Sequence, residues 1–199
     1  VDSPTNGTQT DTGAGGEVVG NYATFNPLAG STIGTLSNGN LQHTYNSTNF
    51  SRKVSTLGVT SGKWYAEFTF QTTGDNISQC GVVSFVPPVN GNNQNNEETG
   101  GCHYNGDNSS FDGTIFVGNT RVSTGNTAAS NGDIIGVALD ADTNNVKFFR
   151  NGSAVGSSSG YTATNVSGTW YFMSSLRSNA VTVVNFGQRP FAYTAPSGY

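Results

Sequence analysis

The stretch GDIIGVALDADTNNVKFFRNG, residues 132–152, decides the fold class. Its first part, 133–140, is almost continuously apolar, a pattern typical of a central strand that is covered on both faces. The polar run 140–145 supplies side chains that tolerate a left-handed backbone, so it predicts a turn into a second strand over 145–150. Asn151 and Gly152 then form the dipeptide that most strongly indicates a tight hairpin. The stretch therefore predicts two successive hairpins in an antiparallel sheet.

A similar pattern of predicted strands and turns extends outward from this stretch over residues 21–199. Short apolar runs alternate with clusters of turn residues, which predicts an all-β fold of antiparallel strands packed as a sandwich or barrel. No segment shows a sustained 3.6-residue period, so no helix longer than about two turns is expected. Strands are predicted at 22–25, 39–45, 52–54, 63–71, 79–86, 102–104, 114–117, 133–140, 145–150, 169–175 and 180–186.

The predicted strand 63–70, KWYAEFTF, alternates between two faces. Side chains two residues apart in a strand point to the same face. We expect one face to lie in the core and the other, with Tyr65, Glu67 and Thr69, to point away from it. The predicted core residues of this strand are Trp64, Ala66, Phe68 and Phe70. Trp170, the second tryptophan, is also predicted to be in the core.

Domain organisation follows from a change in residue composition near residue 21. Residues 1–20 are rich in Gly and Thr and nearly devoid of large apolar groups, which indicates a linker or N-terminal extension. Residues 21–199 form one predicted domain. The chain begins with Val1 and has no signal peptide, so we expect it to be part of a longer product. The irregular run 87–101 is either a functional loop or a solvated excursion without a role.

Composition narrows the function. Only 10% of residues are charged and the net charge is -4, while 34% are hydrophobic, so the chain is expected to fold with a neutral, polar surface. Such a surface suits secreted or particle-borne proteins. The 8 Lys and Arg residues are scattered, which argues against a nucleic-acid partner. No window approaches the roughly 20 apolar residues of a membrane span, so membrane insertion is not expected.

The residues that usually carry catalysis are not grouped in the sequence. His43 and His103 are the only histidines and lie in no metal or triad motif. Glu97 and Glu98 are adjacent in the irregular run, not held apart on a rigid frame as a glycosidase pair would be. We therefore predict no catalytic residues and no cofactor.

Metal and disulfide chemistry have little support in the sequence. Cys80 and Cys102 are either bridged or, as the favoured alternative, two buried thiols. Asp140, Asp142 and Asn144 have the alternate spacing that can converge on calcium, but turn capping explains these residues more simply. No metal site is predicted.

Candidate ligand-binding residues surround a glycine-containing turn. Aromatic rings stack on sugars or apolar peptide groups, and Asn and Asp supply directional hydrogen bonds. The alternative is that Tyr104 and Phe111 merely anchor this loop to the core, and it is slightly favoured. The candidates are His103, Tyr104, Asn105, Asp107 and Phe111.

Several motifs in the right order resemble those of SPRY domains. GDIIGVALD (132–140) and VKFFRNG (146–152) resemble the core signature of the family, and SGKWYAEF (61–68) resembles its upstream strand. GVV (81–83) and NFGQRPF (185–191) match its next and last strands. The resemblance implies a concanavalin-like sandwich of two antiparallel sheets, in which loops at one end meet the ligand. It also implies a binding module and not an enzyme.

Both ends of the chain resemble SPRY copies in tail proteins of marine bacteriophages. The resemblance is carried by DSPTN (2–6), GNYATFNPL (20–28) and FGQRPFAYTAPSGY (186–199). It implies a virion protein of the tail or fibre that takes part in host-surface recognition or adhesion. Its implied partners are other virion proteins, a host cell-surface glycan or protein, and further copies of the chain in a homo-oligomer. A protein-interaction adaptor, a capsid decoration protein and a carbohydrate-active enzyme are the alternatives.

Overall fold

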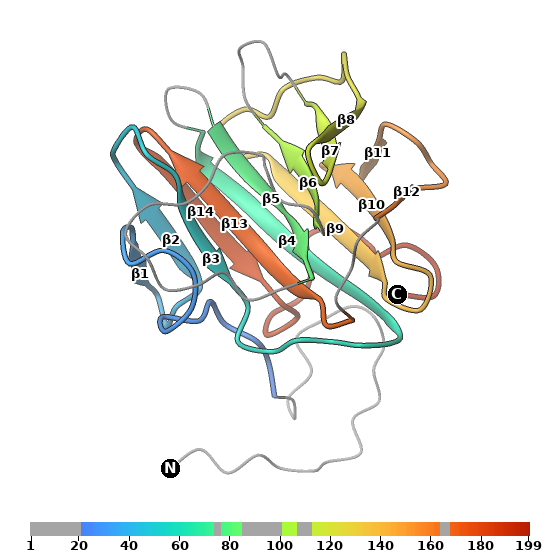
Figure 1. The fold of residues 1–199 in the computed structure, drawn as a ribbon, viewed down its shortest axis with the longest axis horizontal. Helices are drawn as coiled ribbons and strands as arrows, with labels where there is room; N and C mark the ends of the chain where they lie inside the picture. The colour runs from blue at the N-terminus through green and yellow to red at the C-terminus, as the bar shows by residue number, and fades with distance from the viewer. Residues whose placement is uncertain (1–20, 74–76, 85–100, 107–112, 164–167) are drawn as a thin grey trace.

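The computed structural model describes residues 21–73, 77–84, 101–106, 113–163 and 168–199, and these residues form a sandwich of two antiparallel sheets (Figure 1). One sheet has eight strands in the order β1-β2-β14-β4-β9-β10-β11, with β12 also paired to β10. The other has six in the order β3-β13-β5-β6-β7-β8. No helix occurs in the described ranges, as the sequence predicts.

The strand bounds are β1 (Thr35–Ser37), β2 (Gln42–Tyr45), β3 (Ser51–Val54), β4 (Lys63–Thr72), β5 (Ile77–Val83), β6 (Gly101–Asn105), β7 (Ile115–Val117), β8 (Thr120–Ser123), β9 (Ile134–Asp140), β10 (Asn145–Arg150), β11 (Ser153–Val155), β12 (Tyr161–Thr162), β13 (Tyr171–Arg177) and β14 (Ala180–Asn185). The run 87–101 lies outside the described residues, together with Glu97 and Glu98, except for Gly101 at the start of β6. Residues 1–20 lie outside them as well.

The β9–β10–β11 unit confirms the two predicted hairpins. β9 lies between β4 and β10, and its residues 135–139 are buried. Asn144, in the first turn, has a φ of 55°. In the second turn Asn151 and Gly152 have φ values of 48° and 78°, the left-handed pair that a two-residue hairpin needs to follow the twist of the strands.

The core lies between the two sheets. Alternate residues of β4, β9 and β10 supply one side, and the even-numbered residues of β5 and β6 supply the other. Trp170 is 1% exposed and is a core residue, as predicted. The largest fully buried apolar residues of the core include Phe25, Phe68, Phe70, Tyr104, Ile135, Leu139, Phe148 and Trp170.

The prediction that Trp64 lies in the core is wrong. Ala66, Phe68 and Phe70 are fully buried as expected, but the Trp64 side chain at the start of β4 is 45% exposed. Trp64 is the second residue of β4, and its Nε1 donates at 2.7 Å to the carbonyl oxygen of Ser61 in the turn that leads into the strand, so the ring is held at this end of the sandwich.

Several short segments also differ from the predicted strands. The segment 22–25 is irregular apart from one isolated bridge between Phe25 and Ser55. β1, β8 and β12 are not among the predicted strands: β1 and β8 are short, polar edge strands without apolar alternation, and β12 has only two residues.

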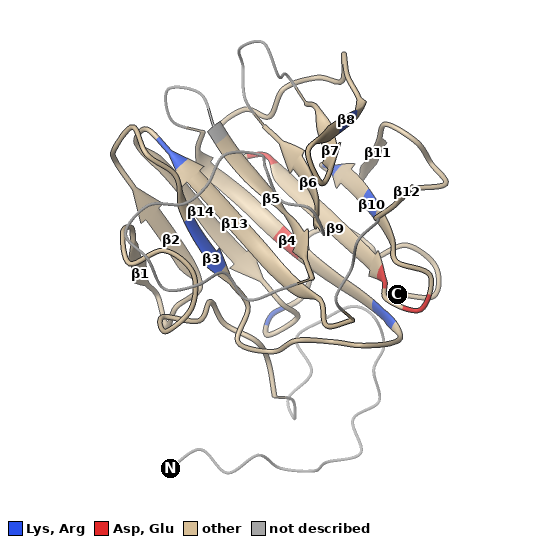
Figure 2. Cartoon of the chain, viewed as in Figure 1, with Lys and Arg blue, Asp and Glu red and all other residues tan. Residues whose placement is uncertain are grey.

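Charged residues are sparse over the sandwich, and Lys and Arg lie on several strands of both sheets (Figure 2). None of the described elements is a helix long and apolar enough to cross a membrane.

Candidate binding site

A hollow of ≈ 540 Å³ opens where the start of β4 meets the loop 55–62, the segment 21–23 and the C-terminal segment 186–199. The C-terminus lies beside the turn between β9 and β10, at the same end of the sheet as the start of β4 (Figure 1). We call this hollow the aromatic pocket. Its aromatic lining consists of Tyr22, Trp64, Tyr65, Phe172, Phe186, Phe191 and Tyr199.

The C-terminal segment is held in place by Glu67, which points away from the core on β4. The backbone N–H groups of Ala192 and Tyr193 donate to its two carboxylate oxygens, at 2.8 and 2.9 Å. Phe191 packs edge-on against Tyr65, with ring centroids 4.9 Å apart. Glu67 is only 3% exposed, and charge-assisted bonds of this kind are stronger than neutral ones. The outer face of β4 is therefore covered by the chain's own tail, which forms one wall of the pocket.

The polar groups of two of the pocket's aromatic residues, Trp64 and Tyr65, are already engaged within the chain. Trp64 Nε1 donates to Ser61, and the Tyr65 hydroxyl donates to Glu67 Oε1 at 3.4 Å. Burial raises the pKa of Tyr65, and the nearby Glu67 carboxylate raises it further, so the phenol stays neutral. Trp64 and Leu57, 45% and 43% exposed, therefore offer apolar surface to a ligand.

Lys63 supplies the charge of the pocket. Among the described residues that line it, Lys63 alone has a charged side chain. Its Nζ lies over the ring of Tyr199, 5.4 Å from the centroid, in a cation–π contact. The pocket thus combines an apolar floor with one cation at its rim.

Three of the sequence-predicted ligand residues lie elsewhere, on β6. His103 is 3% exposed, and Tyr104 and Asn105 are fully buried. His103 stacks on Phe116 at 5.0 Å, and the Tyr104 hydroxyl donates at 3.1 Å to the carbonyl oxygen of Thr127. Tyr104 belongs to the core, which was the favoured alternative for this residue.

None of these three residues lines the aromatic pocket. Asp107 and Phe111 lie outside the described residues. A ligand-binding role for the five candidates stays a prediction.

The histidines are buried and held in the neutral form. His43 contacts the hydroxyls of Ser51 and Ser174, at 2.8 and 3.2 Å. Burial and the charge of Lys53 lower its pKa to about 3. Burial and the charge of Arg52 lower the pKa of His103 to about 3 as well. Both histidines are therefore structural residues of the domain interior.

The thiols and turn carboxylates have structural positions too. Cys80 and Cys102 are unbridged core residues, and burial raises the pKa of both thiols. Asp140 Oδ1 accepts hydrogen bonds from the backbone N–H groups of Asp142 and Thr143, which is turn capping. Within the described ranges, no three His, Cys, Asp or Glu side chains are grouped to hold a metal ion.

The signal for the aromatic pocket lay in the tail sequence FGQRPFAYTAPSGY, which is rich in aromatic residues. Sequence reasoning assigned Trp64 to the core because strict alternation along β4 places it on the core face. Alternation says nothing of where the facing sheet ends, so the exposure of Trp64 needed the structure.

The two antiparallel sheets packed face to face define the class of protein, an all-β sandwich. Residues 63–189, more than half of the chain, match the family model described as the SPRY domain, and the chain belongs to this family. SPRY domains are generally non-catalytic modules that mediate protein–protein interactions. No curated protein matches the chain significantly.

Solved structures share the fold. The SPRY domain of human HERC1 is 19% identical, with a TM-score of 0.63 over 80% of this chain and 96% of that one. The TRIM65 PSpry domain is 12% identical, with a TM-score of 0.62 over 83% and 90%. Stonustoxin is 15% identical, with a TM-score of 0.57 over 83% of this chain and 27% of its own. These similarities confirm the fold.

Proposed function

We propose that this SPRY domain is a non-catalytic protein-interaction module, and that its aromatic pocket binds a short peptide segment of a partner protein. The observation that carries the proposal is the exposed Trp64 ring in a preformed hollow. Exposed aromatic residues in concave sites are typical anchors of protein interfaces, because they bury large apolar areas at little entropic cost.

The hydrogen bonding of the pocket favours a peptide over a sugar. Trp64 Nε1 and the Tyr65 hydroxyl are used within the chain. Ser55 Oγ donates to the carbonyl oxygen of Leu57 and accepts from the N–H of Phe172. A sugar needs several free directional partners, whereas an apolar side chain needs only apolar surface.

Lys63 indicates which kind of residue lies next to the apolar anchor residue of the partner peptide. A carboxylate on the partner would meet its ammonium at the rim, where exposed charges add modest affinity and steer association. The proposed ligand is thus a peptide with an apolar or aromatic side chain beside an acidic residue.

We further propose that the module works in a bacteriophage virion, as part of a tail or fibre protein that contributes to host-surface recognition. The support is the charged content of only 10% and the resemblance of both chain ends to phage SPRY copies. Recovery of the full-length gene product from purified particles is the expected result. Its absence from particles would leave the adaptor alternative.

Peptide display tests the binding proposal. Random peptides are selected on the wild-type domain, and the enriched sequences are assayed against Trp64→Ala and Leu28→Ala. Leu28 is 82% exposed and lies outside the pocket, so its variant is the matched control for loss of a surface apolar group. We expect peptides with an apolar and an acidic residue, a loss of about tenfold or more in Trp64→Ala, and no change in Leu28→Ala. Equal binding to all three proteins would overturn the proposal.

A further inference from the structure

A second hollow, of ≈ 450 Å³, lies between the segment 125–127 and the β10–β11 hairpin. We call it the Arg150 hollow. It lies at the opposite end of β9 from the aromatic pocket: Lys63 pairs with Asp140 at one end, and Arg150 pairs with Ile135 near the other. At a rise of about 3.3 Å per residue, the two ends of β9 lie roughly 20 Å apart. A ligand in one hollow therefore need not touch the other.

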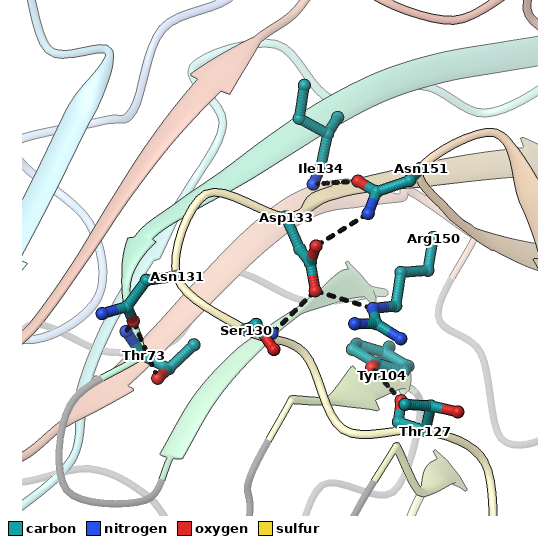
Figure 3. Close-up of polar contacts among 9 residues, drawn as sticks. All are labelled: Thr73, Tyr104, Thr127, Ser130, Asn131, Asp133, Ile134, Arg150 and Asn151. Atoms are coloured by element: carbon teal, nitrogen blue, oxygen red, sulfur yellow. Dashed lines mark hydrogen bonds and ion pairs between the residues drawn. The ribbon is translucent and has the colours of Figure 1, made fainter.

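Arg150 is held in one orientation through a single nitrogen. Its Nε donates to Asp133 Oδ2 at 2.7 Å, and Asp133 also accepts from the Ser130 N–H and from Asn151 Nδ2, both at 2.7 Å (Figure 3). Burial alone would raise the pKa of Asp133, but these hydrogen bonds and the Arg150 charge lower it overall. The carboxylate is therefore ionised, and it accepts three hydrogen bonds.

The two terminal amino groups of Arg150 remain available. No hydrogen bond within the described ranges uses them, although Arg150 lines the hollow and is 24% exposed. An arginine fixed through Nε presents a planar pair of donors that matches the geometry of a carboxylate.

Hydroxyl and amide groups line the rest of the hollow: Asn126 and Thr127 lie on the segment opposite Arg150, and Ser153 lies on the same hairpin as Arg150. Tyr104 fixes the opposite segment by donating to the carbonyl oxygen of Thr127 (Figure 3). Asn126 Nδ2 donates to the carbonyl oxygen of Gly113 and to Ser123 Oγ, so the amide oxygen of Asn126 is turned away from these two partners. In the part of the chain that the structure describes, the Thr127 and Ser153 hydroxyls and Asn126 Oδ1 make no further hydrogen bond.

We propose that the Arg150 hollow binds an acidic saccharide. The sugar carboxylate accepts from the two terminal amino groups of Arg150, and its hydroxyls bond to Thr127, Ser153 and Asn126. No aromatic ring is among the described residues that line the hollow, so a peptide anchored by an apolar side chain gains little there. A sugar acid combines one carboxylate with several hydroxyls, and the hollow offers hydrogen-bonding partners for both kinds of group.

Calorimetric titration tests the proposal with two acidic probes, trigalacturonate and sialyllactose. The methyl ester of trigalacturonate and unmodified lactose are the matched neutral ligands. We expect binding of at least one acidic probe, with a loss of roughly tenfold to a hundredfold for its neutral counterpart and for Arg150→Gln. Arg189→Gln, at an exposed arginine outside both hollows, is the control protein and should bind as wild type.

Two further proteins separate the explanations. Asp133→Asn keeps Arg150 but loosens its orientation, so we expect a severalfold loss of affinity without loss of the fold, checked by thermal unfolding. Trp64→Ala should leave saccharide binding unchanged, which keeps this proposal independent of the peptide site. Failure of both acidic probes to bind, equal binding by Arg150→Gln, or tighter binding of pentaglutamate than of either sugar would overturn the proposal.

Discussion

The ring of Tyr65 occupies the space that a side chain at Gly136 would need. A Cβ at Gly136 would lie 3.0 Å from both Cε2 and Cζ of Tyr65. Tyr65 is itself pinned by Phe191 and by its hydrogen bond to Glu67, so the ring is not free to move aside. The contact joins β4, whose first residues line the aromatic pocket, to β9, the apolar strand of the stretch 132–152.

Gly136→Ala is therefore expected to destabilise the domain by about 1–3 kcal/mol, the usual cost of overpacking. Urea unfolding of the wild type and the variant measures the loss. In a Tyr65→Ala background the ring is gone, and the same change at Gly136 should cost clearly less. An equal cost in both backgrounds would show that the Tyr65 ring is not the obstacle.

Glu67→Gln should loosen the C-terminal tail. One carboxylate oxygen that accepts from Ala192 or Tyr193 becomes an amide donor, so we expect a loss of about 1–3 kcal/mol and faster amide exchange at both residues. Asp142→Asn is the control, because Asp142 also accepts a backbone N–H, from Gly62, in a turn that does not hold the tail. Unchanged amide exchange at residues 192 and 193 in Glu67→Gln would show that Glu67 does not hold the tail in place.

The two tryptophans should respond in opposite ways to truncation. Trp170→Ala removes a ring that is 1% exposed and should cost about 3–5 kcal/mol. Trp64→Ala, at a side chain that is 45% exposed, should change the unfolding free energy by less than about 1 kcal/mol. Similar losses in the two variants would mean that Trp64 is a core residue after all.

Stability should fall on acidification through a window set by the two buried histidines. Burial, with the charges of Lys53 and Arg52, lowers the pKa values of His43 and His103 to about 3, below the ordinary 6.5. The unfolded chain takes up protons below pH ~6.5 that the folded chain refuses, so the stabilisation present above pH ~6.5 is lost as pH falls toward about 3.

With two such groups, the limiting slope is about 2.7 kcal/mol per pH unit. Urea unfolding from pH 7 to pH 4 measures the slope, and His43→Gln should reduce it by about half. A flat profile between pH 6.5 and pH 5 would contradict the buried, neutral state of these residues. Asp133 acts at lower pH, because its pKa is lowered from 3.8.

The fold could be predicted from the sequence because its determinants are local. The apolar run of β9 and the Asn151–Gly152 turn each carry their own signal, through burial on both faces and through a left-handed backbone. The candidate site could not be predicted in the same way. Glu67 and the tail residue Ala192 are 125 positions apart, and no periodicity links a strand carboxylate to a backbone N–H so distant. Spacing likewise placed His103 and Asn105 near a turn but did not show that they would be buried.

The central claim is that the aromatic pocket is the protein-binding site, and the indole N–H resonance of Trp64 tests it most directly. The ¹⁵N-labelled domain has two such resonances, one for each tryptophan, and Trp64→Phe assigns them. Titration with a display-selected peptide should shift the Trp64 indole signal and the backbone amides of residues 57–65 and 186–193, leaving the Trp170 indole signal nearly unmoved. Shifts confined to residues 101–106 or 150–156, with the Trp64 signal unchanged, would contradict the account and place the site on β6 or at the Arg150 hollow.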